Sequence, residues 1–281
     1  MTRSIGTFVL LGASLLVSGQ CLAQRCTRAG LQAAVDSYLD AQTKGQPSLM
    51  ALAPRAKYIE NRKSTSLKSG VIATPQEIDF HRSLLDTENC RTFTEVIIAE
   101  SAHPYVIGTA LTVSRGKVSK IDSLVTDKGD WLFSAQKDFE LAPTQDWDVI
   151  PAKQRDSRKT LLAAANAYFD YFSNKNVKVP WGMPCRRLEG GMLTGKGMPD
   201  DTCNVGVPKG VPITNRQFIV DPVIGGVAGL VAFGKDRLPD VHMFRVEHGK
   251  LRWIDTITVC SKPNCGFPMP KRLRKKGSAP Q

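Results

Sequence analysis

Apolar and polar positions alternate with two different periods along the chain, and each period predicts a type of element. Apolar residues three and four positions apart indicate an amphipathic helix over 31–40, and a short helix is expected over 47–52. Alternating positions rich in β-branched residues indicate strands. These strands are expected over 57–61, 78–85, 91–99, 105–113 and 117–126, the last two joined at the Arg115-Gly116 turn.

The same series of elements then occurs a second time. LQAAVDSYLD at 31–40 returns as LLAAANAYFD at 161–170. HRSLLD at 81–86 matches NRQFIVD at 215–221, with Arg82 opposite Arg216, and RGKVSKIDSLVT at 115–126 matches HGKLRWIDTITV at 248–259. Three matches in one order indicate a tandem repeat. The second copy is expected to contain a helix over 160–172 and strands over 186–188, 213–221, 227–233, 241–247 and 251–259.

The repeat divides the chain into a first unit over 24–127, a linker over 128–156 and a second unit over 157–266. Each unit has about 100 residues, an ordinary domain size. A helix followed by long strands predicts an α+β unit, with N-terminal helices packed on a curved antiparallel sheet. Because the outer face of such a sheet is also partly apolar, we expect the two units of one chain to associate as a pseudo-dimer. The whole protein is then expected to be a monomer or a higher homo-oligomer.

The two ends of the chain have compositions of their own. Residues 1–23 have the charge, apolar run and small-residue cleavage site of a secretory signal peptide, which predicts a secreted, extracellular protein; an uncleaved signal anchor is the alternative. No other run reaches about 20 apolar residues, so no transmembrane segment is expected. Residues 267–281 form a basic tail, expected to be disordered. Protease trimming at Lys271-Arg272 and binding to anionic surfaces are its alternatives.

Six cysteines remain after signal cleavage, and an even count in a secreted chain favours disulfides. Six cysteines allow 15 pairings. The most local set is Cys26–Cys90, Cys185–Cys203 and Cys260–Cys265. A zinc site made by the last four is the rival, but their spacing lacks the tight C-x-x-C pattern of zinc ribbons.

Charge and motifs narrow the classes of function. The formal net charge is +12, of which Arg3 and five basic tail residues supply half. The folded body has no basic stripe interleaved with aromatic residues, so no nucleic-acid partner is expected. The four histidines are scattered, and phosphate-loop, zinc-protease and serine-hydrolase signatures are missing from the sequence. Neither a metal nor a cofactor is therefore expected.

Three segments carry a resemblance to a known fold. The opening helix L-x-A-A-x-x-x-Y-[LF]-D, the KYIEN strand at 57–61 and the final G-K hairpin resemble the nuclear-transport-factor-2-like cone fold, also called SnoaL-like or ketosteroid-isomerase-like. CSKPNCGFP at 260–268 is also similar to the end of secreted fungal proteins of an uncharacterised family with the same tandem layout. The resemblance covers about residues 26–270 and implies a pocket between helix and sheet. This fold hosts enzymes, binders and transport factors alike.

The first unit offers four candidate catalytic residues: Tyr58, Glu60, His81 and Arg82. Tyr58 and Glu60 are two positions apart on one strand, so they share a face. A carboxylate and an imidazole in one apolar pocket can move a proton, because burial raises the carboxyl pKa. Glu60 or His81 would be the base, with Tyr58 or Arg82 stabilising an oxyanion. The alternative is that Glu60 is a solvated strand-end residue and His81 is structural.

The second unit offers four candidate ligand-binding residues: Arg187, Glu189, His242 and Trp253. Glu189 falls where Glu60 does, whereas Arg187 replaces Tyr58. His242 lies on an apolar strand face. The alternative is that His242 is a core residue and that Trp253 serves only in packing. Because the two polar sets differ, either one unit carries the site or neither catalyses.

These observations predict a secreted protein that binds a small hydrophobic or aromatic molecule. The resemblance implies, as a possible activity, cofactor-free acid–base chemistry on a hydrophobic or polyketide-like metabolite, by a lyase, isomerase or cyclase. The alternatives are a non-catalytic ligand carrier or effector-type interaction protein, and a purely structural pseudo-dimer. The sequence does not name the ligand.

Overall fold

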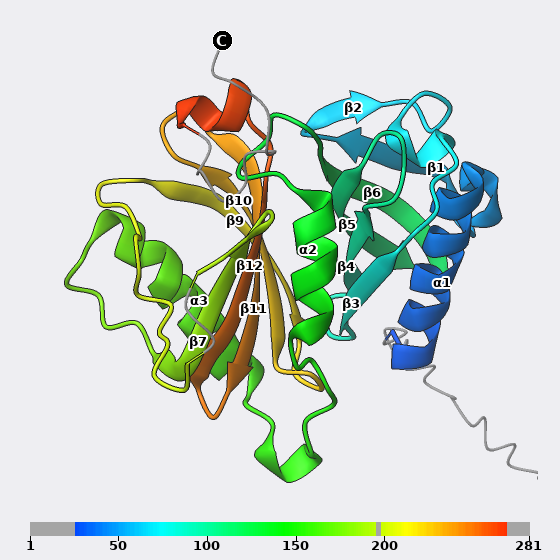
Figure 1. Ribbon diagram of the computed structural model, residues 1–281. Coiled ribbons are helices and arrows are strands. Elements are labelled where there is room, and N and C mark those ends of the chain that lie inside the picture. The colour runs from blue at the N-terminus through cyan, green and yellow to red at the C-terminus, as the bar shows by residue number, and fades with distance from the viewer. Residues whose placement is uncertain (1–25, 195–197, 269–281) are drawn as a thin grey trace, which may run out of the picture.

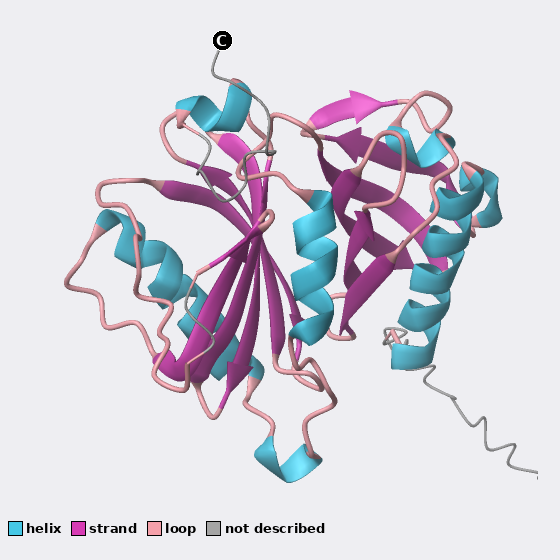
Figure 2. Ribbon diagram, in the orientation of Figure 1, coloured by secondary structure: helices cyan, strands magenta, loops and turns pink. Residues whose placement is uncertain are grey.

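The computed structural model describes residues 26–194 and 198–268. The predicted signal peptide over 1–23 and residues 269–281 of the predicted tail lie outside these ranges. The described residues form two six-stranded sheets that lie side by side, each with a long helix on its outer face (Figure 1, Figure 2). All strands of one sheet precede residue 127, and all strands of the other follow residue 180.

The first sheet has the strand order β2-β1-β6-β5-β4-β3 and is covered by α1. Two short 3-10 turns lie before β1 and β3. The elements are α1 (Arg28–Lys44), η1 (Pro47–Leu49), β1 (Leu52–Glu60), β2 (Lys63–Thr65), η2 (Val71–Ala73), β3 (Phe80–Asp86), β4 (Arg91–Ile98), β5 (Tyr105–Ser114) and β6 (Lys117–Thr126).

The second sheet repeats that order as β8-β7-β12-β11-β10-β9 and is covered by α3. The predicted linker contains a helix, α2 (Ala135–Leu141), and two 3-10 turns, η3 (Ala142–Thr144) and η4 (Ala152–Gln154). The second unit contains α3 (Arg158–Ser173), β7 (Trp181–Glu189), β8 (Met192–Leu193), β9 (Ile213–Asp221), β10 (Gly226–Phe233), β11 (Leu238–Glu247), β12 (Lys250–Thr258) and η5 (Pro263–Gly266).

Both sheets are mixed. The prediction of wholly antiparallel sheets is therefore wrong for one pair of strands in each unit. β1 runs parallel to β6, and β7 runs parallel to β12. After the short β1–β2 hairpin the chain crosses to the opposite edge of the sheet before it starts β3. The last strand of the unit then returns beside β1 in the same direction.

The side-chain hydroxyl groups of two residues cap the N-termini of the two long helices and set where each helix starts. The Thr27 side chain accepts a hydrogen bond from the Gly30 amide at 3.0 Å, and Ser157 accepts one from the Thr160 amide at 3.1 Å. Gly45 ends α1 in the left-handed conformation, with φ at 60°. The apolar side of each helix then packs on its own sheet.

Three disulfides join the pairs that the sequence predicted. Their Cα–Cα distances are 5.3, 5.0 and 4.8 Å, within the ordinary range for such bonds. The first ties the start of α1 to the β3–β4 turn, the second joins β7 to the loop before β9, and the third closes a short turn after β12. They are Cys26–Cys90, Cys185–Cys203 and Cys260–Cys265.

The sheet faces that point away from α1 and α3 pack against each other. One hydrophobic cluster takes Leu84 and Phe93 from the first sheet and Ile219 and Met243 from the second, all at most 2% exposed. Burying a large apolar side chain stabilises a fold by about 1.5–3 kcal/mol. The two sheets therefore share a core between them, in addition to the core that each forms with its own helix.

Two arginine–aspartate pairs link the units reciprocally. Arg28, which begins α1, contacts both carboxylate oxygens of Asp221 at 2.8 and 2.9 Å. Arg158, which begins α3, contacts both oxygens of Asp86 at 2.8 Å. Each arginine starts the helix of one unit, and each aspartate ends a strand of the other unit.

Both aspartates also bind the backbone of the opposite unit. The Val220 amide donates to Asp86 at 3.0 Å, and the Leu85 amide donates to Asp221 at 2.9 Å. Burial alone would raise the pKa of the Asp86 carboxyl, but the hydrogen bonds from Arg158 and Val220 outweigh it and hold this pKa below its ordinary value. The Asp86 carboxylate is therefore ionised, and both aspartates are paired in the interface.

A second polar cluster lies between the sheets around Arg82, which is 8% exposed. Its guanidinium donates to Glu95 at 2.5 Å, to Asp255 at 2.7 Å and to the Gln145 carbonyl at 2.6 Å. The Gln145 amide group in turn donates to Asp255 at 2.7 Å, and the Trp147 ring lies 4.6 Å from the guanidinium carbon. The linker therefore closes this cluster with an amide and an indole.

Asp138 of α2 adds a third carboxyl group to the same cluster. Its pKa is raised well above the ordinary value by burial and by the neighbouring Glu95 and Asp255 carboxylates. Burial likewise raises the pKa of Asp255 to about 7, although Arg82 opposes the shift. One guanidinium faces three carboxyl groups, so the folded protein holds protons here at near-neutral pH.

Replacing Asp86 by Ala is expected to lower the free energy of unfolding by about 3 kcal/mol, because it leaves Arg158 and the Val220 amide without their partner. Urea denaturation at pH 7 measures the change. Glu88→Ala is the matched control, since Glu88 faces the same arginine at 3.6 Å but is 71% exposed. Equal losses in the two variants would contradict the role of Asp86.

The stability of the wild-type protein is expected to fall as the pH rises from 5 to 8. In this range the folded state keeps protons on Asp138 and Asp255 that the unfolded state has already released, so the free energy of unfolding decreases. Asp138→Asn should flatten this slope, and Asp146→Asn, at an exposed position, should not. Denaturation series at several pH values test this; identical slopes for all three proteins would refute it.

Candidate functional site

The second unit contains a cavity of about 390 Å³ between α3 and the concave face of its sheet. We call it the cone cavity. Its walls are mainly aromatic and aliphatic, with Tyr168 and Phe172 from α3 and Phe233 from β10. Trp131 of the linker and Phe267 complete the wall, their rings packed edge to face at 5.6 Å.

Strand register brings three of the predicted ligand-binding residues together in this cavity. Arg187 and Glu189 are two positions apart on β7 and share a face. Thr256 of β12 lies opposite Glu189 on one side and opposite His242 of β11 on the other. A polar row therefore crosses three neighbouring strands and faces an otherwise apolar space.

Arg187 is held by several partners at once. Its guanidinium donates to the carbonyl oxygens of Cys203 and Val205 and lies 3.0 Å from Glu189 Oε1. Glu189 Oε2 accepts a hydrogen bond from the Trp131 indole at 3.1 Å. The positive charge of Arg187 is therefore balanced inside the cavity, and both side chains are fixed in place.

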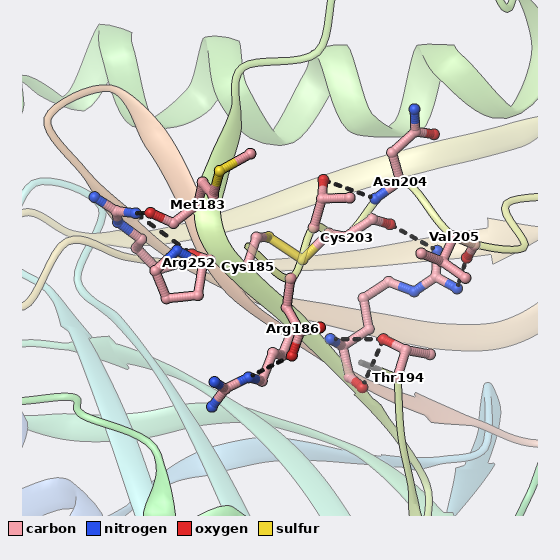
Figure 3. Close-up of a disulfide and its surroundings, with 12 residues drawn as sticks. Met183, Cys185, Arg186, Thr194, Cys203, Asn204, Val205 and Arg252 are labelled. Carbon is pink, nitrogen blue, oxygen red and sulfur yellow. Dashed lines mark hydrogen bonds and ion pairs between the residues drawn. A yellow bond between two sulfur atoms is a disulfide. The ribbon is translucent and has the colours of Figure 1, made fainter. Parts of the chain in front are cut away.

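The Cys185–Cys203 disulfide positions the loop that binds Arg187. Figure 3 shows this bond between β7 and the loop, with Thr194 and Val205 nearby. The Thr194 hydroxyl accepts from the Arg187 amide at 3.0 Å, which adds a further tie to β7. The covalent link thus keeps the carbonyl groups of the loop at the end of the Arg187 side chain.

His242, which lines the cone cavity, forms an acid–base pair with the buried Asp240. His242 Nδ1 lies 2.9 Å from Asp240 Oδ2, and Thr258 donates to Asp240 Oδ1 at 2.6 Å. The histidine and the aspartate are 3% and 1% exposed. Although close, the nitrogen and the carboxylate oxygen are not aligned as a hydrogen bond.

Polar atoms without hydrogen-bond partners are concentrated at this site. They are His242 Nδ1, Asp240 Oδ2, Thr256 Oγ1 and Arg187 Nε, four of the seven such buried side-chain atoms among residues 26–194 and 198–268. Buried polar groups are nearly always paired in folded proteins, so each exception needs a reason. A cavity that presents several of them is suited to a ligand with its own polar group.

Aromatic rings enclose the imidazole of His242. The rings of Tyr168, Phe169, Phe233 and Phe244 have centroids 5.3–6.4 Å from it. Burial raises the pKa of Tyr168 above its ordinary value, so its hydroxyl stays protonated. The surroundings exclude water from the histidine on the sides that face these rings.

The corresponding space in the first unit is closed. Tyr58 and Glu60 occupy the positions of Arg187 and Glu189, and the Tyr58 hydroxyl donates to Glu60 Oε2. The Val71 amide donates to the same oxygen at 2.7 Å. Gly70 packs so tightly on Tyr58 that a Cβ atom there would lie 2.2 Å from the ring. Both candidates are satisfied side chains that pack against the 70–73 segment.

The four candidate catalytic residues do not meet, which corrects the first-unit prediction. β1, which carries Tyr58 and Glu60, and β3, which carries His81 and Arg82, are separated in the sheet by β6, β5 and β4. His81 is exposed, whereas Arg82 lies in the cluster between the sheets. The expectation of one shared pocket fails because a single sequence does not show the strand order.

Trp253 is not part of the cone cavity. It lies on β12 three positions from Thr256, so the two residues point to opposite sides of the strand. Its ring contacts the Arg186 guanidinium at 5.5 Å. The structure therefore does not bring Trp253 together with the other three candidates, and Trp131 supplies the indole in the cavity wall.

Sequence reasoning missed Asp240, Thr256, Tyr168 and Trp131. Asp240 is two positions before His242, and Thr256 two positions before Thr258, so strand alternation already placed each pair on one face. Tyr168 belonged to the repeated framework, where its conserved spacing indicated packing rather than a site. No sequence signal brings Trp131 from the linker to the second unit.

Residues 154–258 match the model of a protein family described as a domain of unknown function, DUF8021. The match covers the second unit and about a third of the chain. None of the curated proteins matches this chain.

Two solved structures are similar to part of the chain. One is an NTF-2 like protein of unknown function from Burkholderia xenovorans LB400, with 14% identity over 35% of this chain and 84% of its own, at a TM-score of 0.28. The other is AclR from Streptomyces galilaeus, with 12% identity over 36% of this chain and 91% of its own, at a TM-score of 0.26. At these scores neither likeness carries an argument about function.

In residues 26–194 and 198–268 no helix is long and apolar enough to cross a membrane. Within the same ranges, histidine, cysteine, aspartate and glutamate side chains form no group of three or more that is arranged to hold a metal ion.

Proposed function

We propose that the protein is secreted and binds a small, mainly apolar molecule in the cone cavity of its second unit. The observation that carries this proposal is an aromatic cavity lined by the buried polar side chains of Arg187, His242 and Thr256, each of which has an atom without a hydrogen bond. An apolar pocket with a few convergent polar groups is the usual form of a small-molecule site. The three disulfides are consistent with secretion, since such bonds persist in oxidising compartments.

The volume of the cone cavity limits the size of the ligand. A water molecule takes about 30 Å³ of liquid, so about 390 Å³ holds roughly thirteen water-sized groups. A compound of one or two rings fits this space. Its ring system would contact Phe172 and Phe233, and one hydroxyl or carbonyl group would face Thr256 and His242.

In this proposal the first unit is scaffold, and the whole chain is an intrachain pseudo-dimer. The reciprocal Arg28–Asp221 and Arg158–Asp86 pairs support the pseudo-dimer, because an isologous interface uses each contact twice. The closed space around Tyr58 supports the scaffold role of the first unit.

2-Naphthol is expected to bind with a Kd of about 0.1 mM, as eleven non-hydrogen atoms at about 0.5 kcal/mol each give −5.5 kcal/mol. Naphthalene, which lacks the hydroxyl, should bind about fivefold more weakly. Ligand fluorescence measures both affinities. Val211→Trp, in the cavity wall, should abolish binding, and Val149→Trp, at a position that is 62% exposed, should not. Unchanged binding by Val211→Trp would refute the site.

A catalytic role for the same site is a second candidate, favoured by the His242–Asp240 pair. His242 would take a proton from a carbon beside a ligand carbonyl and return it to the ligand, and Asp240 would stabilise the imidazolium. The Thr256 hydroxyl would donate to the developing oxyanion. His242 takes up one proton and gives one back, so this isomerisation needs no cofactor. Exchange of the imidazolium proton with solvent before its return would label the ligand in D₂O.

The exchange of 2-tetralone α-protons for deuterium separates the two candidates. A catalyst is expected to accelerate the exchange, and His242→Gln should lower the rate about 100-fold or more, because a general base contributes 10²–10⁴. His81→Gln and Glu60→Gln, both outside the cone cavity, should have no effect. Proton NMR in D₂O follows the reaction. If 2-naphthol binds and the wild-type protein gives no acceleration, the protein is a carrier.

A further inference from the structure

The interface between the two sheets contains two places where equivalent residues of the two repeat copies lie, as judged from the strand pairing. On one side Arg82 of β3 lies opposite Glu95 of β4. On the other side Gln217 of β9 lies opposite Leu230 of β10. Both offsets are 135 residues, the same as between Asp86 and Asp221 at the ends of the two strands.

The opposite unit adds an aspartate to each position. Asp255 of β12 completes the first one and binds Arg82 at 2.7 Å. Asp122 of β6 is its counterpart, since Asp255 lies opposite Met243 and Asp122 opposite Ala110 at a common offset of 133 residues. Each position thus combines two strands of one unit with the last long strand of the other.

The chain fills only the first of these positions. The linker follows β6 and brings Gln145 and Trp147 over Arg82. Gln145 accepts a hydrogen bond from Arg82 through its oxygen and donates one to Asp255 through its nitrogen, each bond 2.6–2.7 Å long. A primary carboxamide therefore bridges a cation and a carboxylate there.

The second position is a cavity of about 250 Å³, which we call the inter-unit cavity. Its charged groups are Arg62, Lys120, Asp122 and Asp240. The Lys120 and Asp122 side chains are 2.6 Å apart, and Arg62 donates to the carbonyl oxygens of Val231 and Arg237. Asp122 Oδ1 accepts no hydrogen bond from the described residues, and the exposed amides of Asn215 and Gln217 line the same space. A cation and a carboxylate are again adjacent, without a bridging group from the described chain.

We propose that the inter-unit cavity binds a small neutral molecule that carries a primary carboxamide. Its oxygen would accept from Lys120 Nζ, and its amide nitrogen would donate to Asp122, as Gln145 does between Arg82 and Asp255. The lining holds two carboxylates and two cations, so a carboxylate ligand would meet repulsion from Asp122 and Asp240, and an ammonium ligand would meet repulsion from Lys120 and Arg62. Only a neutral group with both a donor and an acceptor satisfies the two side chains together.

The size of the cavity and its surroundings agree with such a ligand. About 250 Å³ holds roughly eight water-sized groups, which suits a molecule of six to nine non-hydrogen atoms. Ile59, Leu124 and Leu230 provide apolar contacts for a short carbon chain. Asp240, the partner of His242, lines this cavity as well, but the proposed contacts with Lys120 and Asp122 do not depend on the function proposed for the cone cavity.

The test compares three compounds with the same five-carbon chain: glutaramide, glutarate and 1,5-diaminopentane. Glutaramide is expected to bind with a Kd of a few millimolar, since nine atoms at about 0.4 kcal/mol each give −3.6 kcal/mol. The dianion and the dication should bind at least fivefold more weakly. Chemical-shift titration of the full-length ¹⁵N-labelled protein measures all three. Equal or stronger binding of either charged compound, or no binding of glutaramide, overturns the proposal.

Three variants locate the binding site. Gln217→Trp fills the cavity from an exposed position and should abolish glutaramide binding, while Gln32→Trp, on the exposed side of α1, should leave it unchanged. Asp122→Ala removes the acceptor and should weaken binding at least fivefold even if Gln217→Trp fails to fold. His242→Gln should have no effect, and a loss of binding in that variant would place glutaramide in the cone cavity instead.

Discussion

The buried carboxylates of Asp86 and Asp221 are the constraint on which the arrangement of the two units depends. A buried carboxylate is tolerated only when it is paired and hydrogen-bonded. Each of these two finds its arginine and its backbone amide in the opposite unit, so neither unit alone satisfies it. The pairs also fix the direction in which each helix leaves the interface. The two sheets must then meet through their helix-free faces, and the spaces under the helices remain on the outside.

The two copies agree at some positions and differ at others. In the interface the repeat preserves Asp86 and Asp221, and Asp122 and Asp255, whereas Gln217 is the counterpart of Arg82. Under the helices it preserves Tyr38 and Tyr168, but the first strands of the two sheets differ. One copy now has Tyr58 against Gly70, which closes its space. The other has Arg187 at the position of Tyr58, and its cavity is open.

The sequence predicted local features well, because their causes are local. The helix over 31–40, the hairpin around Arg115-Gly116 and the disulfides Cys185–Cys203 and Cys260–Cys265 each follow from nearby residues, whereas Cys26–Cys90 spans 64 residues. Three of the four ligand-binding candidates also meet in one cavity, since alternation along β7 and β11 sets their faces. The role of that cavity stays a prediction. The strand order was not predictable, because non-local pairing leaves no mark in a single chain, and His81 was therefore placed beside the wrong partners.

When the two copies of the repeat are matched, an offset that is wrong by one residue assigns the wrong counterpart to Arg82. The repeat places Arg82 and Arg216 together at an offset of 134 residues, whereas the strand pairing makes Gln217 the counterpart of Arg82. A bulge between β9 and β10 shifts the register by one residue, and a shift of one residue turns a side chain to the other face of a sheet. Arg216 consequently reaches Asp170 on α3, at 2.8 Å, instead of the interface. Gln217 therefore stands where the other side has Arg82, and the opposite unit supplies Arg62, Lys120 and Asp122 around a cavity with room for a further group.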